Sequence, residues 1–344
     1  MPVLTTDEHV DFVNSTLPYL DTGNFTDLTT DTQKFYALPM LTKKEKVEFQ
    51  KGQSIRVNAV TGNNNSYREV GLYAQDVYND IDATTYGTAP WRHATWNYVL
   101  DRVLDELNSG DDTRILNLLK VKKYQAWMSA AEGLEASWWS KPLDSTDETK
   151  FWGVKMWLVS NSAAGFNGGN PSGYTNGAIL NATTTTRWKN YTDRYVDVST
   201  DDFVFRVRKA CSQVSFTSPV PTGEARKVGI KKQAYVNIDT YLDLQELVRQ
   251  NNENLGNDLA KFENQATICN VPFNYVPYLD SDTTDPCYMI NWETLHPVAL
   301  KDEFLYESKA EKVPGQHRVI KVDCDLTMNY VCTDKRSNAI IDKA

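Results

Sequence analysis

Histidine beside acidic residues is the first combination in this chain that could do chemistry. His93 lies between Trp91 and Trp96, and acidic residues follow it in the same segment: Asp101, Asp105 and Glu106. A histidine that a carboxylate orients can act as a general base. No nucleophile motif accompanies it, so we interpret His93 as an interfacial or packing histidine.

A glycine-rich stretch at 163–177, AAGFNGGNPSGYTNG, is the second candidate. Loops that hold phosphates combine backbone N–H groups with a Gly-Lys-Ser/Thr ending or open a helix after a strand. This stretch has neither context. We therefore interpret it as a mobile loop and not as a nucleotide site.

Metal-ligating residues are few. The chain has five cysteines, with no Cys-x-x-Cys pair: Cys211, Cys269, Cys287, Cys324 and Cys332. It has four histidines: His9, His93, His296 and His317. Their spacing matches no zinc site, so we expect reduced, mostly buried thiols, no metal and no cofactor.

Acidic and aromatic residues leave one enzymatic alternative. Asp and Glu together number 45, and nine tryptophans would suit a glycosidase, but nothing singles out a catalytic pair of carboxylates. A carbohydrate-active enzyme remains an alternative, although we expect no catalytic residues. The net charge of −9 argues against general nucleic-acid binding. We expect no membrane span and no signal peptide, and hence a protein that stays in the cell that makes it.

The element that must position most of the chain is a long helix predicted at 112–140. Apolar side chains recur there at the spacing of one helix face: Tyr124, Trp127, Ala131, Leu134 and Trp138. Small residues on the flank would allow close approach by another element: Ala126, Ala130, Gly133 and Ser137. Pro142 stops the helix. We expect the apolar face to pack on a sheet.

Before this helix the chain is polar. Residues 1–45 cannot form a core and are expected to be a tail or an arm that orders on a neighbour. Residues 46–81 predict a hairpin, with strands at 55–59 and 67–72 around turn residues at 61–65. Neither strand has a strongly apolar face, so the hairpin requires a partner surface.

After the long helix, short elements of both kinds alternate irregularly. We predict a buried strand or short helix at 151–160, helices from Ser199 and at 240–251, and strands at 233–238, 271–279, 289–292 and within 318–341. This order indicates the α+β class.

Short motifs also occur in a characteristic order from about residue 35 onward. They include Val60-Thr61-Gly62, Pro90-Trp91-Arg92-His93, Met128-Ser129-Ala130-Ala131-Glu132, Arg187-Trp188-Lys189-Asn190, Val276-Pro277-Tyr278-Leu279-Asp280, Ile290-Asn291-Trp292 and Asn329-Tyr330-Val331-Cys332. Over nearly the whole chain this order resembles the major capsid proteins of tailed bacteriophages, which have the Hong Kong 97-type shell fold.

The resemblance implies four parts within an α+β fold. These are an N-terminal arm at 1–45, an extended β-hairpin loop at 46–81, a peripheral domain at 82–150 and 311–344 with the long spine helix at 112–140, and an axial domain at 151–310. It further implies hexamers and pentamers that form an icosahedral phage head around double-stranded DNA. An encapsulin-like compartment is the alternative within this fold.

Partners and contact residues follow from the same resemblance. We expect other copies of the chain, portal, scaffolding and decoration proteins, and non-specific contact with packaged DNA, with assembly in the host cytoplasm and no membrane. Contacts with neighbouring subunits are expected at Arg56, Asn63, Tyr67, Arg68, Trp91, Arg92, Lys122, Arg187 and Trp188.

Overall fold

The computed structural model describes residues 35–43, 47–62, 67–73, 75, 84–101, 112–216, 231–251, 266–315 and 319–344. Contacts divide the chain into two compact units. The described parts of 93–134 and 302–326 belong to the first unit. Those of 34–92, 135–301 and 327–344 belong to the second.

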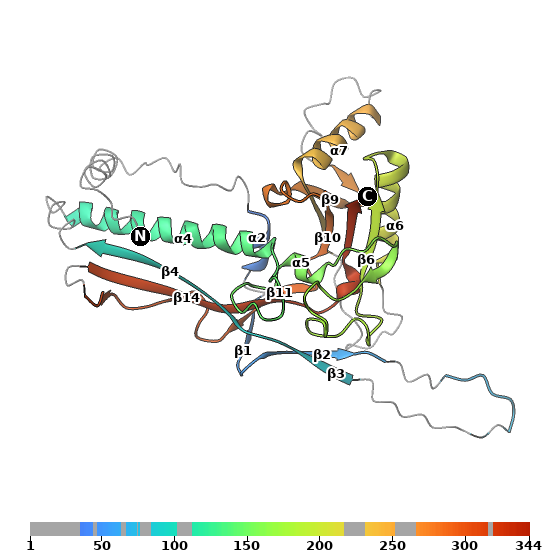
Figure 1. The fold of residues 1–344 in the computed structure, drawn as a ribbon, viewed down its shortest axis with the longest axis horizontal. Coiled ribbons are helices and arrows are strands. Elements are labelled where there is room, and N and C mark those ends of the chain that lie inside the picture. Colours follow the sequence, from blue (N-terminus) through green and yellow to red (C-terminus); the bar gives the residue numbers. More distant parts are fainter. Residues whose placement is uncertain are drawn as a thin grey trace. The chain divides into compact units, whose positions relative to one another are not determined.

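The first unit consists of a helix on a sheet. Helix α4 (Asp112–Trp138) runs alongside strands β4 (Arg92–Asp101) and β14 (Val319–Cys332), as Figure 1 shows. Strands β4, β12 (Tyr306–Glu307) and β13 (Glu311–Lys312) all pair with β14. The helix predicted at 112–140 is confirmed, and the part of it up to Leu134 lies in this unit.

Aromatic and small side chains join α4 to the strands of the first unit. Trp127 packs edge-on against Trp96, with ring centroids 5.3 Å apart. Ala126 packs against a small core of Tyr98, Val322 and Cys324. Lys123 also pairs with Glu307 at 2.8 Å, which joins the helix to β12 and lowers the pKa of Glu307. The helix therefore packs on a sheet, as its periodicity predicts.

Two details of the helix prediction are wrong. Tyr124 is 39% exposed, so the apolar face is not buried along its whole length. A Cβ atom at Gly133 would have no neighbour within 4 Å, so no element approaches the small-residue flank at that position. Periodicity locates the face of a helix but does not show how far a packing partner extends along it.

The second unit is built on a seven-stranded sheet. Its strand order is β5-β6-β15-β10-β7-β9-β8. The bounds are Gly165–Gly168 for β5, Asn190–Tyr195 for β6, Ala339–Lys343 for β15, Cys287–Asn291 for β10, Lys232–Val236 for β7, Val271–Tyr275 for β9 and Thr267–Ile268 for β8. Strand β15 pairs with β6 and β10, so residues 327–344 separate from the rest of the predicted peripheral segment 311–344.

Helices cover one face of this sheet. A π-helical turn (η1, Thr200–Val204) leads into α6 (Phe205–Gln213), and α7 (Ile238–Asn251) follows β7 (Figure 1). Ser199 caps the first turn, since its hydroxyl accepts a hydrogen bond from the Asp202 N–H. Both predicted helices are confirmed, and their apolar side chains form one core with the strands.

Aromatic rings cover the opposite face of the sheet. Tyr235 of β7 contacts Tyr36, Trp139 and Trp292 edge-on, with centroids 5.2 to 6.0 Å apart. Trp138 is fully buried and stacks on Trp292. Such pairs stabilise a core beyond the area that they bury.

The remaining elements are short. Helix α2 (Ala37–Leu41) precedes β1 (Glu48–Gln50), which pairs in parallel with β11 (Leu295–Leu300). Within the segment 151–160, the short helix α5 (Val154–Trp157) is the one of the two predicted alternatives that forms. The strand predicted at 271–279 ends at Tyr275, because Pro277 has no N–H group for a ladder and opens a 3-10 turn (η3, Pro277–Leu279).

Candidate interaction surface

The predicted hairpin forms with a different second strand. Strand β2 (Ile55–Val60) pairs with β3 (Thr84–Ala89), in register from Ile55 opposite Ala89 to Val60 opposite Thr84. The strand predicted at 67–72 is therefore wrong, because these residues are described and form no strand, and the turn predicted at 61–65 falls largely outside the described residues. Residues 63–66 lie outside the described residues. The hairpin is longer than its turn chemistry predicts.

The base of this hairpin is packed, whereas its far end is exposed. Ile55 and Ala89 are buried, but Val60 and Tyr86 are 76% and 66% exposed. At Gly87 a Cβ atom would lie 2.2 Å from the carbonyl oxygen of Ile179, so only glycine fits this approach. Arg56 lies over the Tyr86 ring at 5.8 Å, a contact that both exposed side chains make within the hairpin.

The three most exposed large apolar side chains among the described residues lie in residues 67–73, which we call the apolar loop segment. Tyr67, Val70, Leu72 and Tyr73 are 83%, 63%, 94% and 101% exposed. Four large apolar groups within one short segment form a patch of the kind that marks a protein interface. None of the described residues buries these four side chains.

A buried carboxylate fixes the chain before the hairpin. Glu135 is 1% exposed, and Trp139 donates its indole N–H to Oε1 at 2.9 Å. The main-chain N–H groups of Tyr36 and Ala37 also donate to Oε1, and that of Leu38 donates to Oε2 at 2.8 Å. These donors satisfy the buried charge. Glu135 thus holds the start of α2.

Two residues that we predicted as subunit contacts are buried within the chain. Arg92 is 5% exposed and donates to the carbonyl oxygen of Asp147 at 2.7 Å. Trp188 is 7% exposed. Their burial in the single chain gives no support to a role as contacts, which stays a prediction, and Arg and Trp are equally typical of interfaces and of well-packed interiors.

The other predicted contact residues remain predictions. Arg56, Tyr67, Arg68 and Arg187 are exposed, while Lys122 and Trp91 are half-buried. Trp91 donates its indole N–H to the Gly52 carbonyl at 2.8 Å. Asn63 lies outside the described residues. Three exposed apolar residues were not among the predicted contacts: Val70, Leu72 and Tyr73. The sequence did offer a signal, since it places several apolar residues close together in a segment that has no apolar strand face.

Comparison of the sequence alone finds no relative: no protein-family profile and no curated protein matches it. Comparison of the fold gives a different result. The structure titled the cyanophage A-1(L) capsid asymmetric unit matches with a TM-score of 0.58 at 11% identity, over 92% of this chain and 94% of that one. The capsid of an empty GTA particle matches with 0.55 at 11%, over 93% and 95%. The capsid of Myoviridae phage XM1 matches with 0.53 at 10%, over 94% and 98%.

This chain has the fold of bacteriophage capsid proteins. The coverage exceeds nine tenths of both chains in each pair, so the likeness concerns the whole organisation of the capsid fold and not one shared piece. The likeness to phage capsid proteins that the motif order implied is therefore confirmed. At about one identical residue in ten, the likeness establishes the fold alone.

The structure of this capsid-type chain does not support His93 as a general base that Asp101 orients. His93 is exposed on β4, and its role as an interfacial or packing histidine stays a prediction. Asp101 lies at the other end of the same strand, roughly 27 Å away at ~3.4 Å per residue, and cannot orient His93. Asp105 and Glu106 lie outside the described residues.

The glycine-rich stretch is also structural. Gly165–Gly168 forms strand β5 at the edge of the sheet, which corrects the prediction of a plain loop. A Cβ at Gly168 would meet the Asn190 side chain at 2.0 Å, and Gly173 and Gly177 have φ of +83° and +80°. These glycines serve close packing and turns. Among the described residues, no group of three or more His, Cys, Asp or Glu is placed to hold a metal, and no helix could cross a membrane.

Proposed function

We propose that this chain is the major capsid protein of a tailed bacteriophage, which assembles as hexamers and pentamers into an icosahedral head around double-stranded DNA. The observation that carries the proposal is the fold likeness to phage capsid chains over more than nine tenths of both partners. The role is structural, so the protein needs no catalytic site and no cofactor.

The parts of the fold receive their roles within this proposal. Helix α4 with β4 and the first part of β14 is the peripheral domain, and the seven-stranded sheet with α6 and α7 is the axial domain. The hairpin β2–β3 with the apolar loop segment is the extended loop. The residues before α2 are the N-terminal arm, and Glu135 holds the start of α2 that follows it.

The apolar loop segment supports self-association. Its four exposed apolar side chains would remain in water in an isolated subunit, which is unfavourable at about 25 cal/mol per Å² of apolar surface. A second copy of the chain is the partner that is always present at the concentration of the protein itself. We therefore propose that a neighbouring subunit covers this segment.

The remaining partners follow from the same role. A portal, scaffolding proteins and decoration proteins would join the shell during assembly in the host cytoplasm, and the inner face would touch packaged DNA without sequence preference. The net charge of −9 favours weak DNA contact, because a strongly basic lining would hold DNA during packaging.

Expression of the full chain followed by size-exclusion chromatography and negative-stain microscopy tests the proposal. The expected result is capsomers or closed shells in at least one of several salt and pH conditions. A monodisperse monomer in all conditions contradicts a shell protein. Particles that enclose a peptide cargo would indicate the encapsulin-like alternative instead.

A further inference from the structure

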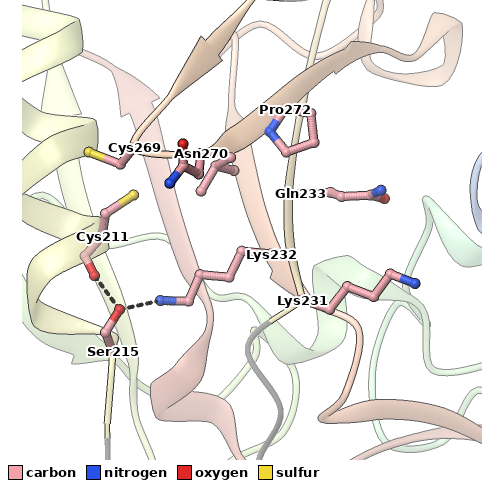
Figure 2. A pocket seen from close by; sticks show the side chains of 9 residues that line it. Cys211, Ser215, Lys231, Lys232, Gln233, Cys269, Asn270 and Pro272 are labelled. Atoms are coloured by element: carbon pink, nitrogen blue, oxygen red, sulfur yellow. Dashed lines mark hydrogen bonds between the residues drawn. The ribbon is translucent and has the colours of Figure 1, made fainter.

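The end of helix α6 and the turn between β8 and β9 face each other across a pocket of about 480 Å³ (Figure 2). Cys211 comes from α6 and Cys269 from the turn, and Figure 2 shows the two side chains as neighbours in the lining of the pocket. Residues far apart in the sequence thus bring two thiols together at the mouth of a pocket.

Cys269 is held in an unusual backbone conformation. Thr267 pairs with Pro272 and Ile268 with Val271, so Cys269 and Asn270 form a two-residue hairpin turn. Both have positive φ, +54° and +60°, as a type I′ turn requires. Asparagine tolerates this region well, whereas cysteine is uncommon there. The turn keeps Cys269 exposed and fixed beside Cys211.

The Cys211 side is equally well fixed. Lys232 donates to Ser215 Oγ at 2.9 Å, and Ser215 donates to the Cys211 carbonyl at 2.7 Å, as the dashed lines in Figure 2 show. Burial, followed by the charge of Cys269, raises the pKa of Cys211 to about 11, while the Lys232 ammonium acts in the opposite direction. Cys211 is therefore a buried thiol next to the exposed thiol of Cys269.

We propose that Cys211 and Cys269 form an oxidisable dithiol, which a peroxide converts to a disulfide that joins α6 to the β8–β9 turn. The Cys269 thiol loses its proton, and the thiolate attacks a peroxide oxygen. The O–O bond breaks, Cys269 becomes a sulfenic acid, and the hydroxide that leaves takes up the proton to form the first water. The Cys211 thiolate then attacks that sulfur and expels a second water. In sum, two thiols and hydrogen peroxide give one disulfide and two waters.

The exposed position of Cys269 makes the pair selective. Cys287, Cys324 and Cys332 are each 0% exposed, so a peroxide in solution reaches Cys269 first. Cys287 is the competing partner for Cys211. Burial raises the pKa of Cys287, and the nearby charge of Cys211 raises it further. A protein that leaves a reducing cytoplasm for an oxidising exterior would meet the conditions for this reaction. The inference holds whether or not the chain forms shells.

Peptide mass mapping tests the dithiol directly. Full-length protein is freed of reductant, treated with hydrogen peroxide at pH 8, unfolded and alkylated with iodoacetamide. The expected result is a linked peptide pair that contains Cys211 and Cys269, with two of the five thiols protected from alkylation. In the Cys269→Ser variant, which changes an exposed side chain, Cys211 should stay alkylatable.

Thermal unfolding of the same samples tests the join between α6 and the turn. Oxidised wild-type protein should unfold on the order of 5 °C higher than after reduction, and Cys269→Ser should show no such difference. Full alkylation of Cys211 after oxidation, a link from Cys211 to Cys287, or a linked pair without any rise in the unfolding temperature would each overturn the proposal.

Discussion

In the seven-stranded sheet every residue of β10 is buried, whereas in strand β2 of the hairpin only Ile55 is. The sheet has helices on one face and aromatic rings on the other, so its side chains find partners within the chain. The hairpin ends in a segment whose apolar side chains face water. The sheet region buries its own side chains, whereas the exposed apolar side chains of the hairpin region are the ones that we propose a neighbouring subunit covers.

The largest effect is expected inside the sheet region. Phe203 is fully buried and packs on Tyr195 at 4.9 Å and Phe273 at 6.1 Å. Phe203→Ala should lower the free energy of unfolding by about 3–5 kcal/mol, because it leaves a cavity. Urea unfolding measures this. Phe205→Ala, two residues away and 61% exposed, is the control and should cost under ~0.5 kcal/mol.

The N-terminal segment is an intermediate case, because one side chain holds it. Glu135→Gln should cost about 2–3 kcal/mol, since an amide NH₂ group replaces an oxygen that accepts main-chain N–H groups. Hydrogen exchange at the amides of residues 36–38 should become faster. The exposed Glu148→Gln serves as the control. Unchanged protection at these three amides would contradict the role of Glu135 as an anchor.

The hairpin base should respond to a single methyl group. Gly87→Ala places a Cβ against Ile179 and should destabilise the attachment of the hairpin by about 2 kcal/mol. The matched control is Gly71→Ala in the apolar loop segment, where a Cβ would have no neighbour within 4 Å. Hydrogen exchange of β2 and β3 distinguishes the two variants, and equal behaviour would show that the base is not tightly packed.

Asp342 is a charged exception within the sheet. Burial, partly opposed by the charge of Arg194, raises the pKa of its carboxyl to about 6. The folded chain therefore binds this proton more tightly than the unfolded chain does, and stability should fall as the pH rises from about 4 to 7. Asp342→Asn should remove about 1–2 kcal/mol of that dependence. A pH series of unfolding curves for both proteins checks it, and identical slopes would contradict the assignment.

Sequence patterns predicted most elements of the sheet region and the long helix, because periodicity reflects burial on one face. They did not predict β3, because Thr84–Ala89 shows no alternation of apolar and polar residues. Its pairing partner is β2, and a long connection separates the two strands in the sequence. The Glu135 anchor depends on contacts nearly a hundred positions apart. The burial of Arg92 and Trp188 within the chain was not predicted, because their residue types do not distinguish burial in a chain from burial between chains.

Replacement of residues 67–73 by a glycine-serine linker of equal length tests whether a neighbouring subunit covers the apolar loop segment. We expect an unfolding curve like that of wild-type protein, because the replaced side chains are exposed in the subunit. It also predicts loss of capsomers and shells in sedimentation and negative-stain microscopy. Normal particles from this variant would contradict the claim that the apolar loop segment is completed by a neighbouring subunit.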